Sequence, residues 1–194
     1  MKWKINSFGG ILLDTGFSRI AVNGGGTPAE LEAAYLEDGK APSALIVTCE
    51  HLHRSRSVGG FCLKHGVPLI TSKLCGERLP LAGVKTRFLA VPGSRLSLTL
   101  GCAFSLHPVR YDSADPFGLT ILDGGTLVGI VPDGRIPPRE AEFFADCDVV
   151  ILGNRLNIPA GAPEALERRL KSVCNTQAEL DAIFEGFSGE LICI

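Results

Sequence analysis

The sequence lacks most features that would place it in a specialised class of protein. It has no apolar run near the roughly 20 residues that a membrane-spanning helix needs, and its start has no uninterrupted apolar segment typical of a secretory signal. It also has no excess charge of one sign, because 19 Lys and Arg stand against 21 Asp and Glu. We therefore expect no membrane partner and no nucleic-acid partner, since a polyanion would require a local basic cluster.

The cysteine pattern excludes a disulfide framework and a zinc ribbon. The seven cysteines are scattered, odd in number and without a CxxC pair, which indicates reduced, mostly buried thiols in a cytoplasmic protein. Internal repeats, low-complexity tracts and linkers are missing as well. A length of 194 residues with 45% hydrophobic content is enough for one buried core, so we expect a single domain over residues 1–194.

Short apolar runs alternate with helical patterns along the chain. Strands are expected at 11–13, 20–22, 44–47, 68–71, 87–91, 96–100, 102–106, 119–122, 126–130, 149–152 and 191–194. Capping boxes at Thr27–Glu30 and Thr176–Glu179 open helices that end at Gly39 and near residue 184. Further helices are expected at 58–65, ended by Gly66, at 140–144 and at 163–173. Helices on either side of a β-rich middle predict two sheets covered by outer helices.

One segment carries a family resemblance. Ala44–Arg56, ALIVTCEHLHRSR, resembles the strand and T-H-x-H-x-D-H loop of the metallo-β-lactamase superfamily, in its small phosphodiesterase- and exonuclease-like branch. Segments similar to other family motifs follow in the same order at 11–39, 111–118, 129–133 and 149–157. The resemblance implies an α/β (α+β) fold, the metallo-β-lactamase αββα sandwich of two mixed β-sheets with outer helices.

The same resemblance implies a depleted metal centre. In this family, His and Asp side chains hold one or two zinc-like ions that activate a water for hydrolysis. The corresponding positions here hold Cys49, His51, His53, Arg54, Tyr111, Asp112, Asp133 and Arg155, and the Asp of an upstream strand is replaced by Asn23. Only His51 and Asp133 are clearly retained ligands, whereas catalytic zinc takes three protein ligands and a water. We therefore expect no cofactor and no binuclear hydrolysis.

Two alternatives stay open for this depleted site. One is a phosphodiesterase-like hydrolase that holds a single zinc-like divalent ion at Cys49, His51 and Asp133. The other is a metal-free pocket in which Arg54, Arg110 and Arg155, together with Arg135 two positions after Asp133, bind a small anion, with His53, Tyr111 and Asp112 beside them.

Plainer interpretations accompany both. The arginines could neutralise Glu50, Asp112 and Asp133, and the Gly24–Gly26 run fits a turn better than a phosphate cradle. A structural subunit or an oligomeric module that binds a protein partner is a third class. The sequence favours a protein that is not an enzyme and binds a small anionic ligand or a protein partner, and it names no substrate.

Overall fold

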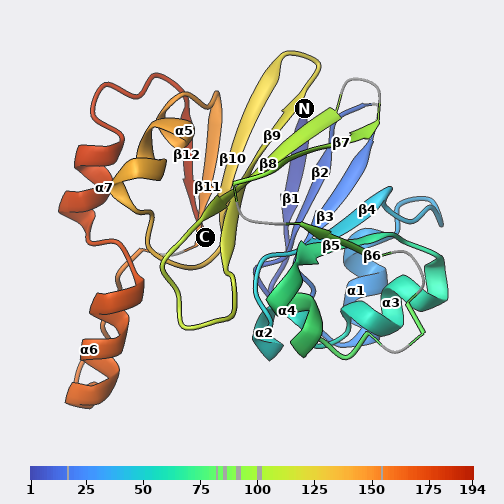
Figure 1. Ribbon diagram of the computed structural model, residues 1–194, viewed down its shortest axis with the longest axis horizontal. Coiled ribbons are helices and arrows are strands. Elements are labelled where there is room, and N and C mark those ends of the chain that lie inside the picture. Colours follow the sequence, from blue (N-terminus) through green and yellow to red (C-terminus); the bar gives the residue numbers. More distant parts are fainter. Residues whose placement is uncertain (17, 82, 85–86, 91–92, 100–101, 154) are drawn as a thin grey trace. The chain divides into compact units, whose positions relative to one another are not determined.

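The computed structural model describes the chain except residues 17, 82, 85–86, 91–92, 100–101 and 154. It divides into two compact units, an N-terminal unit of Met1–Pro92 with Ser113–Asp115 and a C-terminal unit of Gly93–Asp112 with Pro116–Ile194. Each unit contains one six-stranded mixed sheet with its own helices (Figure 1). The two mixed sheets with helices confirm the predicted fold class, while a single domain over 1–194 stays a prediction.

The sheet of the N-terminal unit runs in sequence order. Its strands are β1 (Lys2–Ile5), β2 (Ile11–Asp14), β3 (Arg19–Val22), β4 (Ala44–Val47), β5 (Leu69–Ser72) and β6 (Arg87–Ala90). Strands β1 to β3 pair antiparallel, and β3 to β6 pair parallel. Every residue of β4 and β5 is buried, which explains their continuous apolar sequence, because a central parallel strand is covered on both faces.

The helices of this unit, within its described residues, are α1 (Pro28–Tyr35), α2 (Leu52–Ser55), α3 (Val58–His65) and α4 (Lys73–Arg78). The predicted capping box at Thr27 and Glu30 begins α1, and the predicted stop at Gly66, with φ 66°, ends α3. Leu31 of α1 and Phe61 of α3 belong to one buried apolar cluster with sheet residues such as Leu45. The capped helices therefore cover one face of this sheet.

The sheet of the C-terminal unit has the order β12-β11-β10-β9-β8-β7. Its strands are β7 (Arg95–Thr99), β8 (Cys102–Pro108), β9 (Phe117–Asp123), β10 (Thr126–Val131), β11 (Val149–Leu152) and β12 (Glu190–Cys193). Strands β7 to β10 form an antiparallel meander, and β10 to β12 are parallel. The predicted hairpin between β9 and β10 turns at Gly124 and Gly125, whose φ values of 56° and 87° favour glycine.

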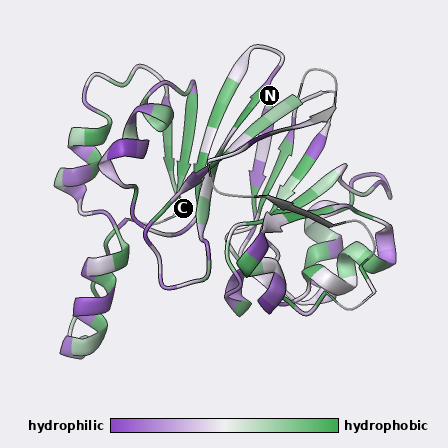
Figure 2. Ribbon diagram, viewed as in Figure 1, coloured by the Kyte–Doolittle hydropathy of each residue, from purple (hydrophilic) through white to green (hydrophobic). Residues whose placement is uncertain are grey.

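In the described part of this unit, the helical segments beside the sheet are η1 (Pro138–Glu140), α5 (Ala141–Ala145), α6 (Glu164–Val173) and α7 (Gln177–Ile183). Phe144 of α5 and Leu180 of α7 share a buried cluster with Val150 of β11, so both helices pack on one sheet face. In Figure 2 the strands of this sheet are largely hydrophobic and α6 is mixed, and Val173 is the one buried residue within α6. Within the described ranges, no helix combines the length and apolar character that a membrane crossing requires.

Some short or exposed elements were missed, and the predicted end of α1 was wrong. The sequence analysis did not predict β1, α2 or α4, because β1 is largely exposed and the two helices are very short. The prediction that Gly39 ends α1 was wrong: the helix ends at Tyr35, and Leu36 is already extended. Gly39, with φ 71°, instead lies in the turn that pairs Glu37 with Lys40.

Candidate functional site

The loop that resembles a metal motif directly follows β4 in the N-terminal unit. Thr48 begins it, and its backbone N–H and its hydroxyl lie 3.0 and 3.1 Å from the Asn23 side-chain oxygen. Cys49 is buried, His51 is half-buried at the start of α2, and His53 is exposed. The two imidazole rings are stacked with centroids 5.7 Å apart. Asn23 thus fixes the start of the loop, and α2 fixes the spacing of the two histidines.

The glycine run before α1 lies against this loop. A Cβ atom on Gly25 would lie 1.6 Å from the His53 carbonyl oxygen, so no larger residue fits there without a backbone shift. The Gly24 N–H donates to the Arg54 carbonyl at 2.5 Å, and the Ser57 hydroxyl donates to the Gly26 carbonyl at 2.6 Å. The run therefore serves close backbone packing, in agreement with the predicted turn.

Arg54 is a buried residue of the N-terminal unit, with 9% of its surface exposed. Its guanidinium Nη1 donates to the carbonyl oxygens of Gly9 at 3.0 Å and Phe8 at 3.4 Å, in the turn between β1 and β2. A Cβ atom on Gly9 would lie 2.2 Å from that nitrogen, so the guanidinium is packed directly against the turn. The Nη1 donor of Arg54 is thus directed at the protein's own backbone.

Glu50 organises this region, and the sequence analysis did not single it out for that role. Its carboxylate accepts from the Ala114 N–H at 3.0 and 3.1 Å and from Arg78 Nη1 at 3.0 Å. These bonds hold Ser113–Asp115, the segment that the contact pattern assigns to the N-terminal unit. No sequence signal identified this pairing, because Ala114 contributes only its backbone.

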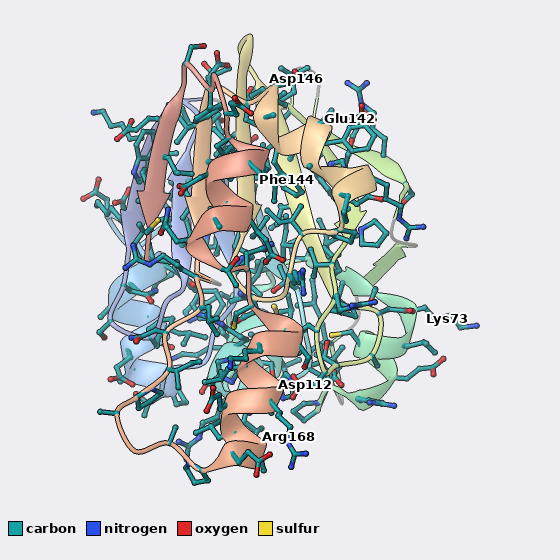
Figure 3. The ribbon with its side chains drawn as sticks, turned by 90° about the vertical axis from the view of Figure 1, so that its left-hand side faces the viewer. Lys73, Asp112, Glu142, Phe144, Asp146 and Arg168 are labelled. Atoms are coloured by element: carbon teal, nitrogen blue, oxygen red, sulfur yellow. The ribbon has the colours of Figure 1, made fainter. Side chains whose placement is uncertain are left out.

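The remaining motif residues lie in the C-terminal unit. Tyr111 and Asp112 follow β8, and Asp133 follows β10. Asp112 lies beside α6 (Figure 3) and accepts from Arg169 Nε at 2.5 Å. Burial raises the pKa of the neighbouring Cys174 thiol, and the negative charge of Asp133 adds to this shift. The Asp112 carboxylate is therefore engaged by an arginine that the sequence analysis did not connect with it.

Three arginines line a groove of about 490 Å³ in this unit. Arg110 and Arg135 form an antiparallel bridge in which each N–H donates to the other's carbonyl at 2.9 Å, and Arg139 follows in η1. Residues directly opposite in such a bridge project to the same side. The other described lining residues are Pro108, Val109, Ile136, Pro137 and Pro138, so the described lining contains no carboxylate.

The three arginines differ in their partners. Arg135 forms an ion pair with Glu179 of α7, and Arg139 Nε lies 3.4 Å from Glu140. Among the residues that the structure describes, no carboxylate forms an ion pair with the exposed Arg110 guanidinium. Arg110 is thus the arginine of this groove with the least local compensation of its charge.

The predicted site residues are distributed over both units. Cys49, His51, His53 and Arg54 belong to the N-terminal unit, whereas Arg110, Tyr111, Asp112, Asp133 and Arg155 belong to the C-terminal unit. Arg155 is exposed, pairs through its backbone with Asn175, and is not among the described residues that line the arginine groove. The predicted metal-binding residues and the predicted anion-binding residues both stay predictions. The structure places Arg135 opposite Arg110 and adds Arg139 and Glu179 to their surroundings.

The donor set does not fit a binuclear metal centre. Within the parts of the chain that are described, no three His, Cys, Asp or Glu side chains form a group that could hold a metal ion. Where a binuclear hydrolase would need further imidazoles, the chain has a guanidinium at Arg54, directed at backbone carbonyls, and a phenol at Tyr111. No step of chemistry is therefore assigned to a metal pair.

Most cysteines are buried, as the sequence predicted. Five are buried, Cys174 is half-buried and Cys193 is exposed, and all seven are free thiols. Burial raises the pKa of Cys62 and of Cys147 to about 12 and that of Cys75 to about 11. A thiol that stays protonated is a poor nucleophile, so these three cysteines have a structural role.

Comparison with known proteins gives a likeness at the level of the whole fold. No family model matches the chain, and no curated protein matches it. Among solved structures, the metallo-β-lactamase fold protein YhfI from Bacillus subtilis is similar with a TM-score of 0.67 and 14% identity, over 96% of this chain and 88% of that one. Igni18, a metallo hydrolase from Ignicoccus hospitalis, is similar with a TM-score of 0.63 and 13% identity, over 99% and 94%. Zn²⁺-bound PqqB from Methylobacterium extorquens has a TM-score of 0.60 and 13% identity over 77% of this chain, which spans 58% of PqqB.

Proposed function

We propose that this chain, which has the metallo-β-lactamase fold, binds a small anionic ligand in the groove lined by Arg110, Arg135 and Arg139. The proposal makes the protein a binder that has no binuclear metal hydrolysis. The observation that carries it is a groove with three arginines and no carboxylate among its described lining residues. Guanidinium groups supply positive charge without a metal and can grip a phosphate or carboxylate through paired hydrogen bonds.

The bridge between Arg110 and Arg135 supports an anion as the ligand. Two side chains that project to the same side from opposite bridge positions bring two positive charges close together. Glu179 compensates Arg135, which leaves Arg110 as the group that gains most from a bound anion. An anion between the two guanidiniums would replace their mutual repulsion by attraction to the anion, and the apolar lining of three prolines with Val109 and Ile136 would lower the local dielectric.

The groove replaces part of the anion site that the sequence predicted. Arg110 and Arg135 are retained from that set, Arg139 is added, and Arg54 and Arg155 are left out. Arg54 is left out because its guanidinium contacts the carbonyls of Phe8 and Gly9. The competing proposal is a hydrolase that holds one divalent ion at Cys49, His51 and Asp133, and metal analysis separates the two.

Two measurements test the proposal. Metal content is measured by mass spectrometry on protein purified without chelator, for the parent chain and for Cys49→Ala and His51→Ala. Phosphate binding is then followed by calorimetry for the parent, for Arg110→Ala and for the control Arg168→Ala, an exposed arginine on α6. We expect substoichiometric metal and millimolar phosphate affinity that Arg110→Ala weakens by roughly tenfold, about 1.4 kcal/mol, and Arg168→Ala leaves unchanged.

Two outcomes of these measurements would contradict the proposal. Stoichiometric metal that both Cys49→Ala and His51→Ala abolish would establish the competing hydrolase. Phosphate affinity that is absent, or equal in Arg110→Ala and the parent, would overturn the anion groove.

A further inference from the structure

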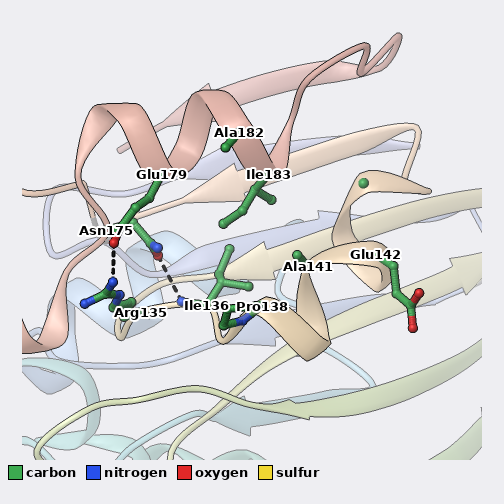
Figure 4. A pocket seen from close by; sticks show the side chains of 10 residues that line it. Arg135, Ile136, Pro138, Ala141, Glu142, Asn175, Glu179, Ala182 and Ile183 are labelled. Carbon is green, nitrogen blue, oxygen red and sulfur yellow. Dashed lines mark hydrogen bonds and ion pairs between the residues drawn. The ribbon is translucent and has the colours of Figure 1, made fainter.

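We infer that the ligand is an amphipathic anion, with a phosphate- or carboxylate-like head at the arginine groove and an alkyl tail in a neighbouring apolar cavity. This inference rests on the proposed function, because the arginine groove holds the head. The cavity lies between α5 and α7, has a volume of about 390 Å³ and is shown from close by in Figure 4. The apolar part of its lining consists of Ile136, Pro138, Ala141, Ala145, Ala182 and Ile183, and the polar part of Arg135, Glu142, Asn175 and Glu179.

The apolar character of the cavity has a clear origin in its residues. Ala141 and Ala145 on α5 face Ala182 on α7, and these short side chains leave space between two helices that pack on the same sheet. The Ile183 side chain points into this space from α7, toward Ile136 (Figure 4). One part of the cavity lining therefore consists of methyl and aliphatic groups, whose contact with an alkyl chain instead of water is favourable.

Three of the four polar lining residues, Arg135, Asn175 and Glu179, already form hydrogen bonds or ion pairs, and the fourth is the exposed Glu142. Arg135 forms its ion pair with Glu179, as Figure 4 shows, and Asn175 Oδ1 accepts from the Ile136 N–H at 2.9 Å. Glu179 also completes the capping box of α7 by accepting from the Thr176 N–H at 3.0 Å. A tail that enters the cavity can thus leave these bonds intact.

The cavity and the arginine groove are neighbours. Arg135, Ile136 and Pro138 line both of them, so one short segment after β10 forms a wall of each. A molecule whose charged end lies against Arg110 and Arg139 can therefore extend past Ile136 into the aliphatic space. A bare inorganic ion would fill only the groove, and a fully apolar molecule would leave the arginines without a partner.

The size of the expected effect follows from burial of methylene groups. Each methylene moved from water into an apolar site improves affinity by up to about fourfold. Butyl, hexyl and octyl phosphate should therefore bind progressively tighter than inorganic phosphate until the tail fills the cavity. If the protein bound only the charged head and left the alkyl tail in water, the affinity would not depend on chain length.

The test measures binding of inorganic phosphate and of these three alkyl phosphates, below their aggregation concentrations, by calorimetry. Ala182→Leu places a larger side chain at the cavity wall from an exposed position, and Ala145→Leu does so from α5. The matched control is Ala165→Leu, an exposed alanine on α6 away from both pockets' lining residues. We expect each cavity variant to remove most of the chain-length dependence and to keep the affinity for inorganic phosphate, while Arg110→Ala weakens all four ligands.

The outcomes separate the two proposals. Equal affinity for all chain lengths, or a chain-length dependence that persists in both Ala182→Leu and Ala145→Leu, would overturn the tail site while inorganic phosphate binding still supports the groove. No binding of any of the four ligands would overturn the groove, and the tail site with it. The same loss in Ala165→Leu as in the cavity variants would also contradict the tail site.

Discussion

Replacing Arg54 with methionine tests whether this residue stabilises the fold or binds a ligand. Methionine keeps an unbranched side chain of similar reach but removes the charge and every donor. The structure gives Arg54 a fold-stabilising role, because its buried guanidinium donates to Gly9 at 3.0 Å and to Phe8 at 3.4 Å. We therefore expect Arg54→Met to lower stability and to leave phosphate affinity unchanged.

The magnitude follows from the two hydrogen bonds. The bond to Gly9 has good length, and a bond from a charged group contributes about 1.5–3 kcal/mol. The bond to Phe8 is long and adds little. The free energy of unfolding should thus fall by roughly 2–3 kcal/mol. For a chain of this size that corresponds to a decrease in Tm of roughly 4–12 °C.

The assay is urea denaturation followed by circular dichroism, together with phosphate calorimetry on the same preparations. Arg56→Met is the matched control, since Arg56 is exposed two residues further along the chain. It should change the free energy of unfolding by less than about 0.5 kcal/mol. If Arg54→Met is as stable as Arg56→Met and also loses phosphate affinity, Arg54 is a ligand-binding residue and our assignment is wrong.

Three further predictions concern stability. Phe144→Ala should cost about 3–5 kcal/mol by urea denaturation, because Phe144 is fully buried, and a similar cost for the exposed Phe143→Ala would contradict the assigned core. Thr27→Ala should cost about 1 kcal/mol by loss of the α1 cap, and an unchanged denaturation midpoint would disprove this role. Burial lowers the pKa of His107, whereas the adjacent Glu140 acts in the opposite direction. The unfolded chain therefore binds a proton at His107 more tightly than the folded chain does. The stability that the buried neutral imidazole contributes is complete above the ordinary pKa of about 6.5 and is lost as the pH falls below it. His107→Gln should therefore lose less stability than the parent on acidification, and parallel pH profiles would refute this.

Local sequence signals predicted the parts of the fold that depend on neighbouring residues. The capping boxes at Thr27 and Thr176, the left-handed stop at Gly66 and the glycine turn after Asp123 are formed within a few residues of chain, so their patterns were sufficient. The continuous apolar run of β4 likewise predicted a strand buried on both faces. Elements without such patterns, namely the exposed β1 and the short α2 and α4, were missed.

The candidate site could be predicted only in part. The sequence identified Arg110 as an anion-binding residue and noted the loss of metal ligands, since both follow from residue type at motif positions. It could not predict that Arg135 bridges to Arg110, or that Arg169 pairs with Asp112, because these partners are 25 and 57 positions apart in the chain (135 − 110 and 169 − 112). It also grouped Arg54 with Arg110, although Arg54 contacts the turn at Gly9.

The sequence alone determined where the capped helices begin, because this depends on residue type and short-range spacing. Through its family resemblance it also indicated the fold class and the shortage of imidazole donors. Only the tertiary structure decided which partner each charged side chain contacts. Whether a guanidinium binds a backbone carbonyl, as Arg54 does, or lines a groove, as Arg110 does, depends on strands and turns that are brought together by burial of apolar surface and are distant in the chain.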